Sequence, residues 1–167
     1  MTGSGETEMA GRTIGALFLC LVVTWLITYF IALGNTFTDF QMMLGQQQEM
    51  INTLLEITVA HFWVYPSLLL GAYGMLVALV AGGLIGGLIT RHPGRAALMA
   101  VIYLAFVFLL STTVLVVNGT ELMAAVSYLI QIIGTNLLEV ILNLVILAAA
   151  VILPAVIGAT LTQPAAN

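Results

Sequence analysis

Four stretches of this sequence are apolar for long enough to cross the hydrocarbon layer of a membrane, which takes about 20 residues at helical rise. They are residues 13–33, 64–90, 96–117 and 137–162. Backbone N–H and C=O groups in lipid need partners within their own segment, so each stretch is expected to be a helix. The sequence therefore predicts an all-α integral membrane protein with four transmembrane helices.

The composition agrees with a membrane location. Of the 167 residues, 62% are hydrophobic and 6% are charged, and lysine is absent. A soluble domain of this size could not cover its core with so few charged side chains. The sequence also offers no basic patch for nucleic acid. The lipid bilayer is the first partner that we expect.

The spans predict a single transmembrane domain over residues 13–163, between short tails at 1–12 and 164–167. The first stretch could also be a secretory signal, since Ala32 and Gly34 are small residues at a possible cleavage point. Its apolar run is about twice as long as a usual signal core, which favours a retained helix.

Three arginines predict the orientation of the chain. Arg12 precedes the first stretch, and Arg91 and Arg95 lie in the turn between the second and the third. Loops with positive charge stay on the cytoplasmic side of a membrane. One topology places all three arginines inside. Both termini are then cytoplasmic, residues 34–63 and 118–136 are extracytoplasmic, and we expect the plasma membrane as the location.

The first extracytoplasmic segment is predicted to form an amphipathic helix over residues 38–62. Its apolar residues recur at helical spacing, and its polar residues fall mostly at other positions. Gly45 could break this helix, and Pro66 could kink its junction with the second stretch. The apolar positions are Phe40, Leu44, Ile51, Leu54 and Leu55.

The second extracytoplasmic segment is shorter and more apolar. About 14 residues are too few to cross the membrane, so we expect an interfacial or re-entrant helix that stops near Gly134. Asn118 begins a glycosylation sequon, but Asn118 with Glu121 also fits a capping box at the start of this helix. We favour the cap, because such sequons are common by chance.

The two halves of the chain resemble each other. The sequences Gly-Arg and Leu-Leu-Glu of the first half both recur in the second half at the same separation. We therefore expect two parallel repeats, 11–90 and 94–162, related by an axis along the membrane normal. Chance similarity is the alternative, because apolar sequences match one another easily.

Glycines in the second stretch predict a helix-packing face. A glycine inside a helix costs about 1 kcal/mol in water, but in lipid small residues four apart let two helix backbones approach closely. The ridge packs either on another helix of this chain, which we favour, or on a second chain in a homo-oligomer. Its residues are Gly74, Ala78, Gly82 and Gly86.

Three polar residues are candidates for an ion or proton site. Glu139 begins the fourth stretch and Asn143 follows one turn later, while Glu56 takes the corresponding place in the first repeat. An ionisable group inside a membrane often marks a transport path. We favour an interfacial position for both glutamates, where water reaches them at little cost.

The sequence lacks the parts of an enzyme site. No Ser or Cys is placed with a His and a carboxylate, and no phosphate-binding loop is present, so we expect no catalytic residue and no cofactor.

His61 with Met42, Met43 and Met50 could bind copper. We assign no metal site, because the spacing is irregular and methionine commonly packs in cores.

These observations favour a non-enzymatic multi-pass membrane subunit. It is expected to assemble with itself or with other membrane protein subunits, through its glycine-rich helix face and its extracytoplasmic helix. The alternative is a small ion or solute channel or transporter, with a path between the two repeats.

Overall fold

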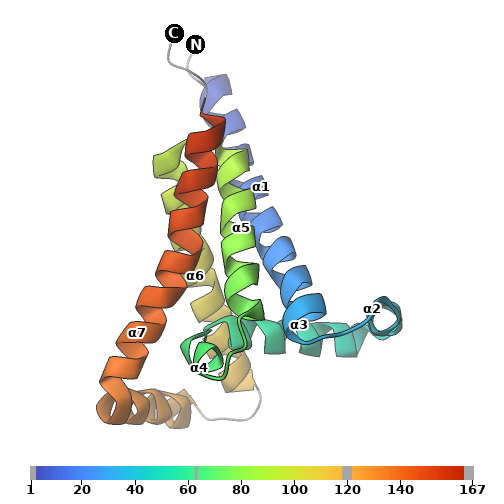
Figure 1. The fold of residues 1–167 in the computed structure, drawn as a ribbon, viewed down its shortest axis with the longest axis vertical. Coiled ribbons are helices and arrows are strands. Elements are labelled where there is room, and N and C mark those ends of the chain that lie inside the picture. The colour runs from blue at the N-terminus through green and yellow to red at the C-terminus, as the bar shows by residue number, and fades with distance from the viewer. Residues whose placement is uncertain (1–2, 63, 118–121, 164–167) are drawn as a thin grey trace.

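The computed structural model describes residues 3–62, 64–117 and 122–163 of the chain (Figure 1). Within these ranges all regular structure is helical, which confirms the all-α prediction. The elements are α1 (Gly3–Ile27), the π-helical turn η1 (Thr28–Ala32), α2 (Phe37–Leu44), α3 (Gln47–Phe62), α4 (Val64–Leu69), α5 (Gly74–Thr90), α6 (Pro93–Val117) and α7 (Leu122–Thr162).

Three helical segments of the described chain are long and apolar enough to cross a membrane. They are Ala10–Ala32, Pro93–Ser111 and Leu137–Thr162. They agree with the first, third and fourth of the predicted stretches, because an unbroken apolar run of this length has no stable alternative to a helix in lipid.

The second predicted stretch, 64–90, is not one helix. It is divided into α4 and α5 by a turn in which Gly71 has a φ of +77°, a conformation that glycine adopts without strain. The 17 residues of α5 are apolar but give a helix of only about 25 Å. The hydropathy pattern predicted a single helix here, because the turn between α4 and α5 is also apolar.

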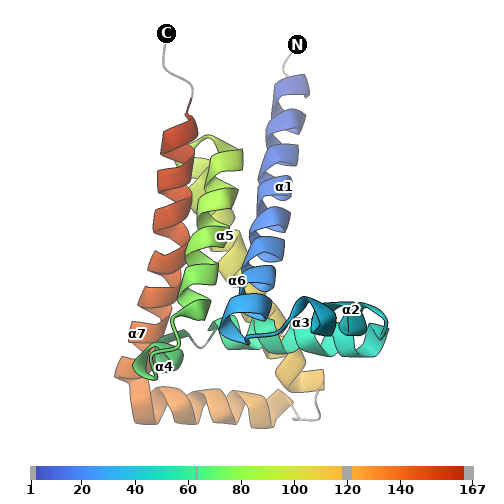
Figure 2. The same cartoon turned by 45° about the vertical axis from the view of Figure 1, so that its right-hand side comes forward.

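The long helices run side by side along the longest axis of the molecule (Figures 1 and 2). α5 lies among the others and contacts α1, α6 and α7. Both termini lie at one end of this bundle. α3, α4 and the first part of α7 lie across the opposite end, where α2 and the start of α3 project sideways beyond α1.

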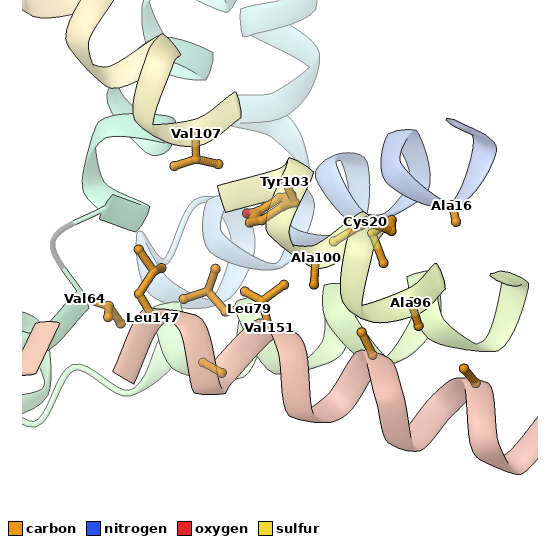
Figure 3. Close-up of a cluster of buried hydrophobic side chains, with 14 residues drawn as sticks. Ala16, Cys20, Val64, Leu79, Ala96, Ala100, Tyr103, Val107, Leu147 and Val151 are labelled. Atoms are coloured by element: carbon orange, nitrogen blue, oxygen red, sulfur yellow. The ribbon is translucent and has the colours of Figure 1, made fainter. Parts of the chain in front are cut away.

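Small side chains form much of the buried core between these helices (Figure 3). They include Ala96 and Ala100 of α6 and Ala155 of α7, all with no exposed surface. Tyr103 and Leu79 are the largest fully buried side chains of this cluster. Helices that present small residues approach each other closely, which replaces lipid contacts by dispersion contacts within the protein.

The predicted helix over residues 38–62 breaks at the predicted place. α2 ends at Leu44, and α3 begins two residues after Gly45. α2 begins at a capping box, in which Thr36 and Asp39 each bind the backbone N–H of the other. The buried residue of α2 is Met43, which packs with Tyr29 and Ile57, whereas Leu44 is 55% exposed.

α7 is one continuous helix of 41 residues, so the predicted stop at Gly134 is wrong. A straight helix of this length would measure about 60 Å. Figures 1 and 2 show instead that α7 first lies across the end of the bundle and then turns to run beside α5.

Asn118 and Glu121 lie outside the described residues, so the sequon and the cap stay predictions. The two repeats and the domain limits also stay predictions.

Candidate functional site

The glycine ridge of α5 faces other helices of the same chain. A methyl group at Gly74 would lie 2.7 Å from the Cα of Ala32, and one at Gly82 would overlap with the Thr24 hydroxyl of α1. One at Gly86 would meet the flexible end of a methionine in α6, and Ala78 has no exposed surface. The ridge is therefore filled from within the chain.

A second glycine face brings the backbones of α5 and α7 into contact. A methyl group at Gly83 would lie 2.5 Å from the carbonyl oxygen of Val151, and one at Gly87 would overlap with that of Ala155. Gly158 of α7 faces the backbone of α5 in return. No side chain separates the two helices along this seam.

The polar candidates of the fourth stretch lie on one side of α7. Asn143 is 1% exposed and takes part in an interaction within the chain, while Glu139, one turn earlier, is partly exposed. The side chain of Glu56 lies outside the described part of the structure. The predicted correspondence of the two glutamates therefore stays a prediction.

The arginines gather at the end of the bundle that carries the termini. Arg12 of α1 and Arg91, which follows α5, line one shallow hollow together with Leu88 and Ile89. Arg91 has a φ of 55° and ends α5, and Pro93 starts α6 two residues later. This turn places Arg95 in the first turn of α6, near the same end.

The structure contains a cavity of about 650 Å³ between α1, α3 and α6, toward the end of the bundle opposite the termini. Its size falls within the range of about 300–1,000 Å³ that is usual for small-molecule sites. Most of its wall is apolar, with contributions from all three helices. Among the lining residues are Phe18 and Val22 of α1, Leu54 and Leu55 of α3, and Phe106 and Leu110 of α6.

Hydroxyl groups in the cavity wall bind to the protein itself. Thr24 Oγ1 donates to the carbonyl oxygen of Cys20 at 2.7 Å. Thr58 Oγ1 donates to the carbonyl oxygen of Leu54 at 2.7 Å. These hydroxyls need no ligand to satisfy their hydrogen bonding.

His61 closes one end of the cavity and fastens α3 to the end of α1. Its Nε2 lies 2.5 Å from Oγ1 of Thr28, and its other ring nitrogen donates to the backbone carbonyl of Ile57. A neutral imidazole has one N–H, so Nε2 accepts from the Thr28 hydroxyl. Burial lowers the pKa of His61 from its usual 6.5 to about 4. The ring is therefore neutral near pH 7.

An aromatic cluster covers the junction of α1, η1 and α2. Trp25 stacks on Tyr29 with ring centroids 5.6 Å apart, and Phe40 lies against both. Trp25 also lines the cavity, and its Nε1 is buried without a hydrogen-bond partner. The cluster fixes the angle at which α2 leaves the bundle.

The structure does not bring the candidate copper ligands into one site. Met42 is 57% exposed, Met43 packs in the aromatic cluster, and His61 is bonded to Thr28. In the described ranges no group of three His, Cys, Asp or Glu residues lies close enough to hold a metal ion.

Sequence reasoning missed the residues that build the cavity wall. Thr24 and Tyr103 stand singly in long apolar stretches, where they carry no motif. One signal was available, because Cys20, Thr24 and Thr28 are spaced four apart and so share one face of α1. That spacing identifies a polar stripe, but it does not say which helix the stripe contacts.

Comparison with known proteins finds no matching family, no similar curated protein and no similar solved structure. Function is therefore argued from the geometry of this chain.

Proposed function

We propose that this chain is a non-enzymatic multi-pass membrane subunit that assembles with itself or with other membrane proteins. In this proposal α1, α5, α6 and the second part of α7 cross the plasma membrane, and both termini are cytoplasmic. α2, α3 and the first part of α7 then lie at the extracytoplasmic surface.

The position of the arginines supports this orientation. Arg12 and Arg91 share one hollow, and Arg95 follows in the next turn of the chain. Both termini lie at the same end in Figures 1 and 2. Positive charge gathered at one end of a bundle favours the cytoplasmic side for that end.

The packing of α5 supports a fourth crossing helix. α5 contacts the three helices that are long enough to span a membrane, and it is apolar throughout. It is about 5 Å shorter than a hydrocarbon layer of about 30 Å. Because α5 contacts all three long helices, we place this short helix inside the bundle, with Val77 and Val80 exposed on its remaining face.

The observation that carries the proposal is the apolar surface of the sideways arm formed by α2 and the start of α3. Phe37 is 65% exposed and Met42 is 57% exposed, although the arm lies beyond the ends of the spans. Large apolar side chains gathered on a projecting surface are typical of interaction sites. We place the assembly surface here, because the glycine ridge is covered by the chain itself.

Contacts with α1 and α6 hold the end of α3 that joins the arm to the bundle, so the arm is ordered before a partner binds. His61 bonds to Thr28 at the end of α1. Ser111 of α6, whose hydroxyl donates to the carbonyl oxygen of Val107 at 2.8 Å, also lies 3.4 Å from the carbonyl oxygen of Thr58. A surface that is already ordered loses less conformational entropy when a partner binds.

A channel or transporter with a path between the repeats is less favoured. The boundary between the proposed repeats has two parts. α1, α3 and α6 enclose the apolar cavity there, and its described lining has no charged residue. The other part is the seam of α5 and α7, where Gly83 and Gly87 lie against the backbone of α7. A solvated ion is far larger than a methyl group, and a methyl group does not fit there. The two helices would have to separate before an ion could pass.

Native size analysis and native mass spectrometry in a mild detergent test the proposal. We expect the wild-type chain as an oligomer or with a stoichiometric partner. Alanine substitutions at three arm positions should abolish this assembly, so that the chain is found as a monomer. Alanine at three exposed positions of α6 and α7 is the matched control and should change nothing. The arm positions are Phe37, Met42 and Leu44, and the control positions are Leu98, Leu144 and Leu153.

A solitary wild-type chain, or an arm variant with unchanged assembly, would contradict the proposal. The transport alternative has its own readout, which is ion flux into liposomes that Glu139→Gln abolishes.

A further inference from the structure

The mouth of the 650 Å³ cavity lies between two helices that are long enough to span a membrane. Three of the residues in its wall are also exposed on the surface, and these residues mark the mouth. Phe18 of α1 is 65% exposed, Phe106 of α6 is 41% exposed, and Ile51 of α3 is 41% exposed. The mouth therefore opens sideways between α1 and α6, toward the space that lipid chains occupy around these helices.

The chemistry of the wall excludes a charged ligand. Among the described residues that line the cavity there is no Asp, Glu, Lys or Arg. The hydroxyls of Thr24 and Thr58 bind backbone carbonyls and both nitrogens of His61 have partners, whereas Nε1 of Trp25 is buried without one. A ligand that brought a charge or several polar groups into this cavity would leave them unpaired, which is costly in an apolar site.

An apolar cavity of this size is costly to leave empty. Protein interiors are packed to the density of organic crystals, and a void leaves its lining atoms without dispersion partners. Water does not fill such a site, because it would find few hydrogen-bond partners there. The medium at the mouth is the hydrocarbon of the bilayer.

One wall of the cavity is α3, which crosses the end of the bundle opposite the termini. The other face of α3 is polar and exposed, and there the Gln48 side chain donates to Oδ1 of Asn52 at 3.4 Å. A polar helix face beside an apolar cavity gives the two environments of an amphiphile, whose headgroup stays at the surface while its chain enters the protein.

We propose that the cavity between α1, α3 and α6 binds one hydrocarbon chain of a membrane lipid, whose headgroup lies beside the polar face of α3. The lipid enters from the side, between Phe18 and Phe106. This site goes beyond the proposed assembly role and requires only that α1 and α6 cross the membrane. Its ligand is defined by an apolar chain, not by a particular headgroup.

A phosphatidylcholine with a dibrominated acyl chain tests the site, because bromine quenches tryptophan fluorescence and also marks the lipid by mass. Trp63→Phe leaves Trp25, in the cavity wall, as the single tryptophan of the chain. The protein is reconstituted with rising fractions of this lipid in palmitoyl-oleoyl phosphatidylcholine. Trp25 fluorescence and native mass spectra are then recorded.

Two pairs of substitutions separate the cavity from ordinary lipid contact. Val22→Phe with Leu110→Phe fills the cavity from both walls. Leu19→Phe with Leu109→Phe adds the same side chains to exposed positions of the same two helices, outside the cavity. Helix content measured by circular dichroism and the thermal transition check that each variant folds. If a pair does not fold, the four single variants are tested in the same way.

We expect one brominated lipid retained per chain and a saturable quenching of Trp25. Filling the cavity should lower the retained fraction at least about fivefold and remove most of the saturable quenching, while the control pair behaves like the parent. Equal lipid retention in both pairs overturns the proposal.

A second copy of the chain in the cavity would also overturn it. The mass spectrum would then show a dimer without lipid, and the cavity-filling pair would dissociate this dimer. The arm variants described above should leave lipid binding unchanged, so failure of the assembly proposal and failure of the lipid proposal give different results.

Discussion

Thr28 and His61 join the end of α1 to the helix that crosses beneath it: Oγ1 of Thr28 lies 2.5 Å from Nε2 of His61, which follows 33 residues later in the chain. Both side chains are buried. The hydrogen bond therefore holds α3 in position at the outer end of the cavity and fixes the base of the arm.

Thr28→Val should weaken this junction. The substitution keeps the shape of the side chain and removes the donor, which leaves Nε2 of His61 buried and unpaired. We expect the free energy of unfolding to fall by about 1–2 kcal/mol in reversible denaturant titrations. The control is Thr160→Val, because the exposed Thr160 hydroxyl binds only a carbonyl of its own helix. Equal losses in the two variants would contradict a specific role for the Thr28–His61 bond.

Acid should destabilise the fold through His61. Its pKa in the folded protein, about 4, lies below the usual 6.5, so the folded state favours the neutral ring. The stability that this residue contributes is complete above pH 6.5 and is lost as the pH falls toward 4. The pKa difference corresponds to about 3 kcal/mol across this window. Unfolding titrations of the wild type and His61→Gln between pH 4 and 8 measure this loss of stability.

The His61→Gln variant should lose most of this pH dependence. His92 lies exposed in the turn between α5 and α6, so His92→Gln is the matched control and should retain the wild-type dependence. The same slope in wild type and His61→Gln would show that other groups cause the acid sensitivity.

Alanine substitutions along α5 should differ by what each new methyl group meets. Gly87→Ala meets the rigid backbone of Ala155 and should cost about 3 kcal/mol or more, since neither helix can move alone. Gly86→Ala meets the flexible end of Met99 and should cost about 1 kcal/mol or less. Denaturant unfolding measures both. Gly15→Ala in α1 has open space and should be neutral or slightly stabilising.

Thr24→Ala should partly rescue Gly82→Ala. The methyl group at Gly82 collides first with the Thr24 hydroxyl, and the next atom, the Cys20 carbonyl oxygen, is 3.0 Å away. The loss in the double variant should therefore be smaller than the sum of the two single losses. Additive losses in the same unfolding assay would mean that α1 and α5 pack differently at this point.

Thr36→Ala should loosen α2. Thr36 accepts from the backbone N–H of Asp39, and the Asp39 carboxylate accepts from Thr36, which lowers the pKa of Asp39 below its usual value. Loss of the cap should speed amide hydrogen exchange in α2 about fivefold, while exchange in α5 stays unchanged. Thr38→Ala, an exposed neighbour on the arm, is the control.

Much of the helical framework could be predicted from the sequence. The fourth stretch, Leu137–Thr162, was found with its observed limits, and the break at Gly45 was anticipated. Both depend on local properties: a long apolar run has to be a helix in lipid, and glycine is a poor helix residue. Prediction failed at Gly71, because a turn made of apolar residues does not interrupt a hydropathy pattern.

The direction of side chains was harder to predict. Periodicity placed Leu44 with the apolar positions of one long amphipathic helix, whereas the structure buries Met43 and exposes Leu44. Both residues belong to α2, and the spacing from Phe40 does not decide which of them faces the aromatic cluster. After the break at Gly45, contact with α1 and α6 determines which face of α3 is buried. The sequence alone does not indicate how α3 is rotated relative to α2.

The sequence by itself determined that the chain is helical, apolar enough for a membrane and provided with a close-packing face on α5. These properties follow from composition and from spacing along one helix. Tertiary structure alone decided that Gly82 packs on Thr24, that Thr28 meets His61, and that α1, α3 and α6 enclose a cavity. Apolar and small residues fit many neighbours almost equally well, so the choice of partner is made only when all the helices pack together.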